Sequence, residues 1–297
     1  MHYAIFYNPT AGRGDNEATA KKIATKLKKA GHTSEALTAP NPEEAVKKIR
    51  NSLTDYDALI SIGGDGTLNL VATAFLQANK TIPLGIIPGG TVNNFATRWE
   101  IPTDLDQAIS LILAQKLQHV GIGSCQDGQK AIVSSLTFGT LADISNQVRQ
   151  SEKRKFGLLI YPLKGLKQIS QKASYHVHIQ AENFDKKMKV WIFLLTTTHL
   201  VGGIDYVASS PHAFHVSILH NMRLGKLFQL LFFVLTGNLR QKENNTLTYL
   251  KPKKITVKSL EQKSIYSRID GDKGPALPLT IEFLDGFLPI YTAGKKD

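Results

Sequence analysis

The chain has 297 residues, of which 42% are hydrophobic, so it can bury a large core and is expected to form two domains. Its formal net charge of +12 favours an anionic partner, such as phosphate, nucleic acid or an acidic membrane surface, although an excess of solubilising lysines would give the same value. The single cysteine, Cys125, excludes an internal disulfide framework and a cysteine-rich zinc site.

The sequence carries no targeting or membrane-spanning signal. The first residues, MHYAIFYNPT, lack the basic-then-apolar pattern of a signal peptide. The longest apolar stretch, residues 227–235, is about half of the roughly 20 residues that a membrane-spanning helix needs. We therefore expect a cytoplasmic protein without a transmembrane segment, which can still contact a membrane from outside.

The first 122 residues alternate strand and helix signals. Short apolar runs predict strands, and apolar residues spaced three or four apart predict helices. In chain order the expected elements are a strand at 3–9, helices at 16–31 and 41–49, a strand at 57–62, a helix at 67–78, a strand at 83–88, a helix at 104–115 and a strand at 117–122. The second helix starts well, because Asn41 can cap it and Pro42 suits its first turn. The alternation predicts an α/β domain with a parallel, Rossmann-like sheet covered on both faces.

From residue 123 to residue 286 the pattern changes to short β-branched or aromatic runs between turn residues. Strands are expected at 175–180, 189–198, 214–220, 254–260, 264–270 and 279–284. Two helical segments, 156–169 and 226–237, interrupt these strands. We expect this region to form an antiparallel β-sandwich domain.

Three glycines surround one acidic residue in the segment SIGGDGTLN, which begins at residue 61. Gly63, Gly64 and Gly66 leave room for an anion to approach the main chain, and the helix that follows adds the positive end of its dipole. Asp65 would repel a bare phosphate, but it suits a magnesium ion that bridges phosphate oxygens. The alternative is a tight strand-to-helix turn that Asp65 caps.

Two further loops follow strands of the same predicted sheet. The loop YNPTAGRG, residues 7–14, and the loop IPGGTVNNFA, residues 87–96, both combine glycines with short polar side chains. Nucleotides bind where the carboxyl ends of several parallel strands converge, so three such loops predict a nucleotide site. The glycine spacing matches neither the dinucleotide fingerprint nor the Walker pattern.

The motifs NPTAGRG, GGDGTLN and PGGTVNNFA, in this order and at this spacing, resemble the diacylglycerol kinase catalytic-domain family. That family covers bacterial lipid kinases and their sphingosine and ceramide kinase relatives. The segment RIDGDKGPALP, residues 268–278, resembles the Asp-Gly-Glu segment of the family. The resemblance implies an ATP- and Mg²⁺-dependent kinase of a lipid hydroxyl, with the nucleotide in a cleft between the two domains. It also implies that a last strand, at about 287–297, returns to the first domain.

The resemblance, carried over by position, implies a set of nucleotide-contacting residues and assigns the metal to Asp65. One family threonine falls at Thr38, although the local alignment can place Ala39 there. The expected nucleotide-binding residues are Asn8, Thr10, Gly12, Thr38, Gly63, Gly64, Asp65, Gly66, Thr67, Asn69 and Thr91.

Two acidic residues near the C-terminus are the catalytic candidates. Asp272 occupies the position of the family's general base, usually Glu, and Asp270 precedes it by two residues. Residues i and i+2 of a strand share a face, so both carboxylates can point into one cleft, one as base and the other near magnesium. The alternative for DGDKG is a hairpin turn, for which Asp-Gly is a usual sequence.

The chain departs from the family pattern at two places. Asn94 stands where the family usually has Asp, so one acidic group is missing. The acidic stretch that the family ties to a structural metal has no counterpart between Asp205 and the strand expected at 214–220, so we do not expect a second magnesium site.

The charge of one segment is the basis for predicting a lipid-binding surface. Residues 149–190 hold ten Lys or Arg against three Asp or Glu around the apolar segment FGLLIYPLKGL, a composition that fits docking to anionic lipid headgroups. A solvated basic face over a buried helix would explain the same residues. A homodimer is compatible with the sequence.

Three hypotheses follow. The first is a lipid kinase with diacylglycerol as the default acceptor, although sphingoid bases, phosphatidylglycerol and other hydroxylated lipids remain open. The second is an NAD kinase-like or sugar kinase, since Gly-Gly-Asp-Gly occurs there too. The third is a catalytically weak regulatory protein that binds nucleotide or lipid. We expect no nucleic-acid partner, because no recognition motif is present.

Overall fold

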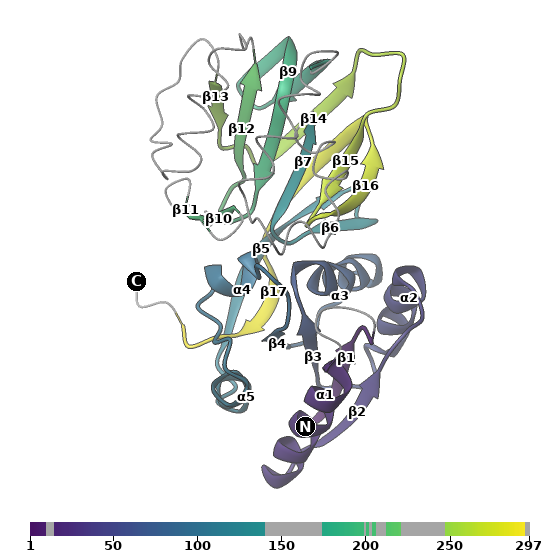
Figure 1. The fold of residues 1–297 in the computed structure, drawn as a ribbon, viewed down its shortest axis with the longest axis vertical. Coiled ribbons are helices and arrows are strands. Elements are labelled where there is room, and N and C mark those ends of the chain that lie inside the picture. Colours follow the sequence, from purple (N-terminus) through teal and green to yellow (C-terminus); the bar gives the residue numbers. More distant parts are fainter. Residues whose placement is uncertain are drawn as a thin grey trace. The chain divides into compact units, whose positions relative to one another are not determined.

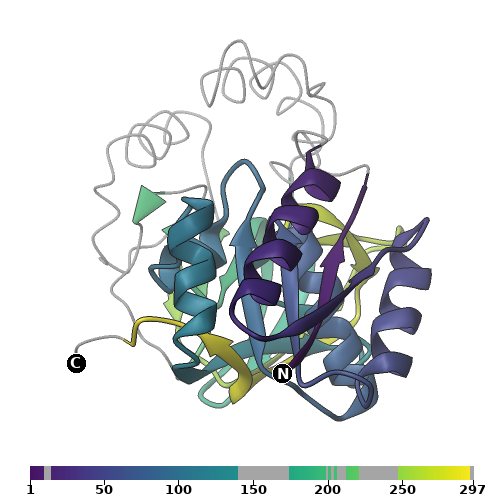
Figure 2. The same cartoon turned by 90° about the horizontal axis from the view of Figure 1, so that it is seen from below.

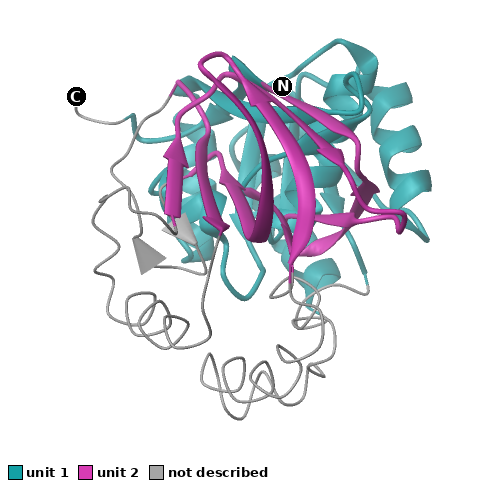
Figure 3. Cartoon of the chain, turned by 90° about the horizontal axis from the view of Figure 1, so that it is seen from above, with its two compact units in different colours: residues 1–134, 283–297 teal, residues 135–282 magenta. Residues whose placement is uncertain are grey.

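The protein divides into two compact units (Figures 1 and 3). The computed structural model describes residues 1–9, 15–139, 174–198, 200–201, 204–205, 212–220 and 247–294. Unit 1 comprises Met1–Ser134 and Phe283–Asp297, and unit 2 comprises Ser135–Glu282. The division lies beyond residue 122 because β6 (Lys130–Ile132) folds back on β5 (Leu117–Cys125) as an antiparallel hairpin.

Unit 1 is built on a parallel sheet. Its strands lie in the order β2, β1, β3, β4, with Thr33–Leu37 as β2, His2–Tyr7 as β1, Ala58–Gly63 as β3 and Leu84–Pro88 as β4. The last residues of β17 (Leu279–Tyr291) extend this sheet, because Ile290 pairs in parallel with Leu84.

Helices cover both faces of this sheet (Figure 2). On one face, β1 side chains such as Ile5 pack with α1 and α5; on the other, alternate side chains such as Phe6 pack with α2, α3 and α4. The helices are α1 (Asn16–Lys29), α2 (Pro42–Ser52), α3 (Asp65–Ala78), α4 (Asn94–Arg98) and α5 (Leu105–Leu113). The predicted α/β arrangement is therefore confirmed, including the Asn41 cap, whose Oδ1 accepts the Glu44 amide at 2.9 Å.

Unit 2 is an antiparallel β structure, as predicted. Its main sheet runs in the order β16, β15, β7, β9, β8, β14, β17, and β12 joins β9 and β13. The strands are β7 (Ser135–Gly139), β8 (Tyr175–Ala181), β9 (Phe184–Thr196), β12 (His215–His220), β13 (Leu247–Leu250), β14 (Lys254–Ser259), β15 (Tyr266–Ile269) and β16 (Asp272–Ala276), with a separate hairpin of β10 (Leu200–Val201) and β11 (Ile204–Asp205). The predicted helical segments 156–169 and 226–237 lie outside the described residues.

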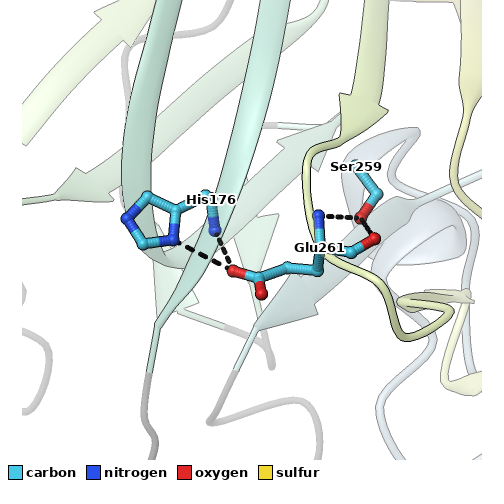
Figure 4. A network of polar contacts seen from close by, with 3 residues as sticks. All are labelled: His176, Ser259 and Glu261. Carbon is cyan, nitrogen blue, oxygen red and sulfur yellow. Dashed lines mark hydrogen bonds and ion pairs between the residues drawn. The ribbon is translucent and has the colours of Figure 1, made fainter.

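A small polar network fixes the turn after β14 against the start of β8 (Figure 4). Glu261 Oε1 accepts the backbone amide of His176 at 2.8 Å and contacts its ring Nδ1 at 3.1 Å. The Glu261 amide donates in turn to Ser259 Oγ at 3.1 Å. These bonds join two neighbouring strands, so the network is explained by the fold of unit 2.

Within the described residues, no helix has the length and apolar character that crossing a bilayer requires.

Candidate functional site

Four loops of unit 1 follow the carboxyl ends of neighbouring parallel strands. Asn8 follows β1, Thr38 follows β2, Gly63 ends β3, and Gly89 follows β4. The strand registers place these ends side by side; Gly63, for example, lies opposite Pro88. The structure therefore brings the described parts of these loops to one edge of the sheet, the edge where open α/β proteins bind ligands. Thr10 and Gly12 lie outside the described residues.

The glycines of two of these loops pack against each other. A Cβ atom on Gly90 would lie 2.6 Å from Gly64 Cα, and one on Gly64 would lie 3.0 Å from Gly90 Cα. The Gly89 amide also donates to the Gly63 carbonyl at 2.9 Å. Gly64 and Gly90 are therefore needed for the close packing of the two loops, whether or not a ligand is bound. This packing requirement joins distant segments and is invisible in either motif alone.

The side chain of Asn93 hydrogen-bonds to the backbone of its own loop, residues 87–96. Its Oδ1 accepts the Gly90 amide at 2.9 Å, and its Nδ2 donates to the Gly90 carbonyl at 3.0 Å. Its backbone is left-handed, with φ of 55°, which Asn tolerates better than most residues. Asn93 is not among the predicted site residues; an Asn three residues after Gly in a turn-rich loop is the signal that could have found it.

Asp65 holds the start of α4. Its Oδ2 accepts the Asn94 amide at 2.9 Å and its Oδ1 accepts the Phe95 amide at 3.0 Å. Burial raises the pKa of Asp65, and the two amide hydrogen bonds only partly offset that effect. Asp65 therefore stabilises a neighbouring helix, whereas the N-cap of its own helix is Gly64. The alternative that Asp65 caps its own helix is wrong.

The residues around Asp65 fit a magnesium ion only as part of a larger complex. An ionised carboxylate has about four acceptor positions, so two amide bonds leave room for a metal. Among the described residues, no group of three or more His, Cys, Asp or Glu could hold a metal ion. Mg²⁺ commonly takes one or two carboxylates together with substrate phosphates. Asp65 thus suits a metal that arrives with phosphate oxygens, not a cage made of protein alone.

The N-terminus of α3 is open to an anion. The first helical hydrogen bond runs from the Leu68 amide to the Gly64 carbonyl, and among described residues no side chain caps this end. The amides of Asp65, Gly66 and Thr67 therefore lack intrahelical acceptors, and they point along the axis with the positive end of the dipole. Such an end binds phosphate through its main chain.

Three predicted nucleotide contacts divide into two groups. Thr91 is exposed on the loop at residues 87–96, where a ligand can reach it. Thr67 is 7% exposed and packs over Gly63, where an added Cβ would lie 2.3 Å from its Oγ1. Asn69 is 3% exposed, and its Nδ2 donates to the Ala131 carbonyl at 2.7 Å. The side chain of Asn69 thus joins α3 to β6, and its role as a nucleotide contact stays a prediction.

Asp270 occupies a turn, contrary to the expectation that it shares a strand face with Asp272. Asp270 and Gly271 have φ of 52° and 93°, so they form the left-handed turn between β15 and β16. Asp270 Oδ1 accepts the Ser135 amide at 2.8 Å, and the Asp270 amide donates to the Ser135 carbonyl at 2.9 Å. Asp270 therefore does not share a strand face with Asp272, because the Asp-Gly pair forms the hairpin turn. Asp272 begins β16 with an exposed side chain.

Comparison with known proteins agrees with this arrangement of loops. Residues 2–125, which carry all three glycine motifs, match the diacylglycerol kinase catalytic domain. Over these residues the chain is similar to that family. The resemblance seen in the sequence is thereby confirmed, and the loops described above lie within the matched residues.

Two relatives and one solved structure extend the likeness to the whole chain. The chain is similar to diacylglycerol kinases of Staphylococcus carnosus, at 26% identity, and Staphylococcus saprophyticus, at 27% identity; each match covers 97% of this chain and 94% of the relative. The crystal structure of a Bacillus anthracis protein, proposed to be a diacylglycerol kinase, has a TM-score of 0.79 at 20% identity and covers 98% and 96% of the two chains. The structural likeness shows that the fold is shared.

Proposed function

We propose that the protein transfers the γ-phosphoryl group of ATP, with Mg²⁺, to the hydroxyl of a lipid such as diacylglycerol. The observation that carries this proposal is the uncapped N-terminus of α3, which lies between two glycine loops at the carboxyl edge of the parallel sheet. It presents main-chain donors to a polyphosphate. The kinase domain and the names of the relatives support the same chemistry.

Each of the described site residues would have its own role in the reaction. The amides of Asp65, Gly66 and Thr67 bind phosphate oxygens, and Thr91 offers a hydroxyl on the neighbouring loop. Asp65 would be the carboxylate that holds a magnesium ion, which would neutralise phosphate charge. Asp272 accepts the proton of the lipid hydroxyl while that oxygen bonds to the γ-phosphorus and ADP leaves with the bridging oxygen. Asp270 has a structural role in its turn.

The acceptor places the protein at a membrane. Diacylglycerol resides in a bilayer, and the net charge of +12 favours an anionic surface. The described part of the basic segment, including Lys186, Lys187 and Lys189, is exposed. We therefore propose a cytoplasmic protein that associates peripherally with anionic lipid.

The test is transfer of label from γ-labelled ATP to a panel of lipids in mixed micelles containing Mg²⁺. Labelling of diacylglycerol, with none of NAD or a soluble sugar, is the expected result. Asp272→Asn should lower the rate of labelling by about 10²–10⁴-fold while leaving nucleotide binding intact. Labelling of NAD instead, or of no lipid in the panel, would contradict the proposal.

One observation favours a second candidate, a nucleotide-binding regulator without turnover. Asn94, which replaces the family's usual Asp, contributes only a neutral side chain, whose Nδ2 donates to Ser134 Oγ at 3.3 Å. ATP binding without transfer to any lipid would identify this candidate. Restoration of labelling by Asn94→Asp would then show that the missing carboxylate is the cause.

A further inference from the structure

Arg98 is a buried cation for which the described residues provide no counter-charge. It is the last residue of α4, and only 3% of its surface is exposed. Its Nη1 atom is fully buried and has no hydrogen-bond partner. No ion pair joins Arg98 to an acid of the described residues, and Glu100, two residues away, is exposed. A buried guanidinium in this state is unusual, because buried charges are ordinarily paired.

The contacts that Arg98 does make are weaker than an ion pair. Its Cζ lies 4.8 Å from the centroid of the Trp99 ring, a cation–π contact. It also lies at the C-terminal end of a helix, where the dipole favours positive charge, but five residues make only a small dipole. Burial lowers the pKa of Arg98, with no acidic group to oppose it, although the guanidinium stays charged at neutral pH. The charge is therefore incompletely compensated within unit 1.

Asp65 does not supply the missing charge, although it binds the opposite end of the same helix. Its carboxylate accepts the amides of Asn94 and Phe95, and among the described residues it forms no ion pair with Arg98. Arg98 thus lies at the opposite end of α4 from the residues that Asp65 contacts. The glycine-loop site does not account for it.

We propose that Arg98 binds the phosphate group of a ligand, at a site distinct from the glycine loops. The guanidinium presents a planar fork of N–H donors that matches phosphate oxygens, and the Trp99 contact holds it while one face stays against the ring. The phosphate comes from a soluble phosphate ester or from a lipid headgroup. This inference goes beyond the kinase proposal and does not depend on phosphoryl transfer.

Trp99 provides a local reporter. The chain has two tryptophans, so the Trp191→Phe protein retains Trp99 alone, beside Arg98. We expect inorganic phosphate to change Trp99 emission in a saturable way, while acetate and chloride at equal ionic strength do not. Arg98→Met, similar in length but neutral, should weaken the apparent affinity at least tenfold. Arg50→Met, which removes an exposed arginine on α2, is the matched control and should leave the titration unchanged.

Separate arms identify the source of the phosphate. Vesicles of phosphatidylglycerol, compared with phosphatidylcholine, test a lipid headgroup, and glycerol 3-phosphate, compared with glycerol, tests a soluble ester. A response that needs Arg98 in either arm supports the site. No response in any arm, an equal response to acetate, or an unchanged titration in Arg98→Met would overturn it.

Thermal unfolding gives a second readout. In phosphate-free buffer, Arg98→Met should have a melting temperature no lower than that of the parent, because it removes an uncompensated buried charge. A clear decrease would show that Arg98 has an internal partner and would contradict the proposal. If Arg98→Met fails to fold, Arg98→Lys keeps the charge, loses the fork and should still weaken phosphate binding.

Discussion

The carboxylate of Asp65, in the first turn of α3, accepts the backbone amide of Phe95 at 3.0 Å and so holds the first turn of α4. One acidic side chain therefore links the two glycine loops from which both helices start. A substitution of Asp65 will change the architecture of the site as well as any chemistry there. The stability of such a variant must therefore be measured together with its activity.

Asp65→Asn should destabilise the protein by about 1–3 kcal/mol, because an amide offers one acceptor where two backbone N–H groups need acceptors. The effect should depend on pH. Burial raises the pKa of Asp65 above its ordinary 3.8, so the folded protein keeps this proton to a higher pH than the unfolded chain does. The stability that Asp65 contributes therefore falls as pH rises from 3.8 toward the raised pKa.

Urea unfolding of both proteins at a series of pH values measures this contribution. The difference in unfolding free energy between the parent and Asp65→Asn should shrink as pH rises through the window. A difference that grows with pH would mean that the two amide hydrogen bonds lower the pKa of Asp65 more than burial raises it.

Gly90→Ala should cost about 1–3 kcal/mol and weaken ADP binding at least tenfold, because its Cβ would lie 2.6 Å from Gly64 Cα. Gly31→Ala is the control: its φ of 81° strains any side chain by about 1–2 kcal/mol, but its Cβ meets open space. Fluorescence titration with a labelled ADP should show a defect in Gly90→Ala alone. Normal ADP binding by Gly90→Ala would separate the glycine contact from the nucleotide site.

Asn69→Ala should destabilise the protein by about 1–3 kcal/mol, because it leaves the buried Ala131 carbonyl without its donor. Thr73→Val removes the hydroxyl that accepts the Ala131 amide at 3.1 Å and donates to Asn69 Oδ1 at 3.3 Å. The double variant should show coupling, since both side chains serve one residue. Denaturant unfolding checks this, with Thr25→Val, on the exposed side of α1, expected to change stability by less than about 0.5 kcal/mol.

Asp270 and Asp272 should differ in what their loss affects. Asp270→Ala should lose about 1–3 kcal/mol of stability, because the Ser135 amide loses its acceptor and alanine disfavours positive φ. Asp270→Asn keeps both features and should retain lipid phosphorylation. Asp272→Asn should fold normally and lose about 10²–10⁴-fold in rate. If Asp270→Asn loses activity to the same extent while folding normally, the base assignment moves to Asp270.

Much of unit 1 could be predicted because its signals are local. The Asn41 cap, the apolar spacing of α1 and the buried runs of β3 and β4 each depend on neighbouring residues alone. The second strand, β2, escaped prediction because most of its side chains are exposed and it lacks an apolar pattern. The five residues of α4 are too few to show a period.

The site was predictable as a set of loops but not as a set of contacts. Glycine-rich segments after strands indicate where an anion can bind, whichever residues surround them. The partners of Asp65, Asn69 and Asp270 lie far along the chain, so no local pattern could reveal that these side chains hold backbone groups. Asp270 shows this most directly, because the same Asp-Gly sequence suits a strand pair and a turn, and the bonds with Ser135 accompany the turn.

The path of β17 has a consequence for biosynthesis. Leu288 and Ile290 belong to the apolar core of unit 1, and Tyr291 packs on the opposite face of its sheet. A ribosome therefore releases most of unit 1 long before it makes the residues that complete it. A nascent chain stalled near residue 282 would carry an unfinished sheet next to β4, where chaperones or other chains could bind. The part of the protein that is made first is thus among the last to be finished.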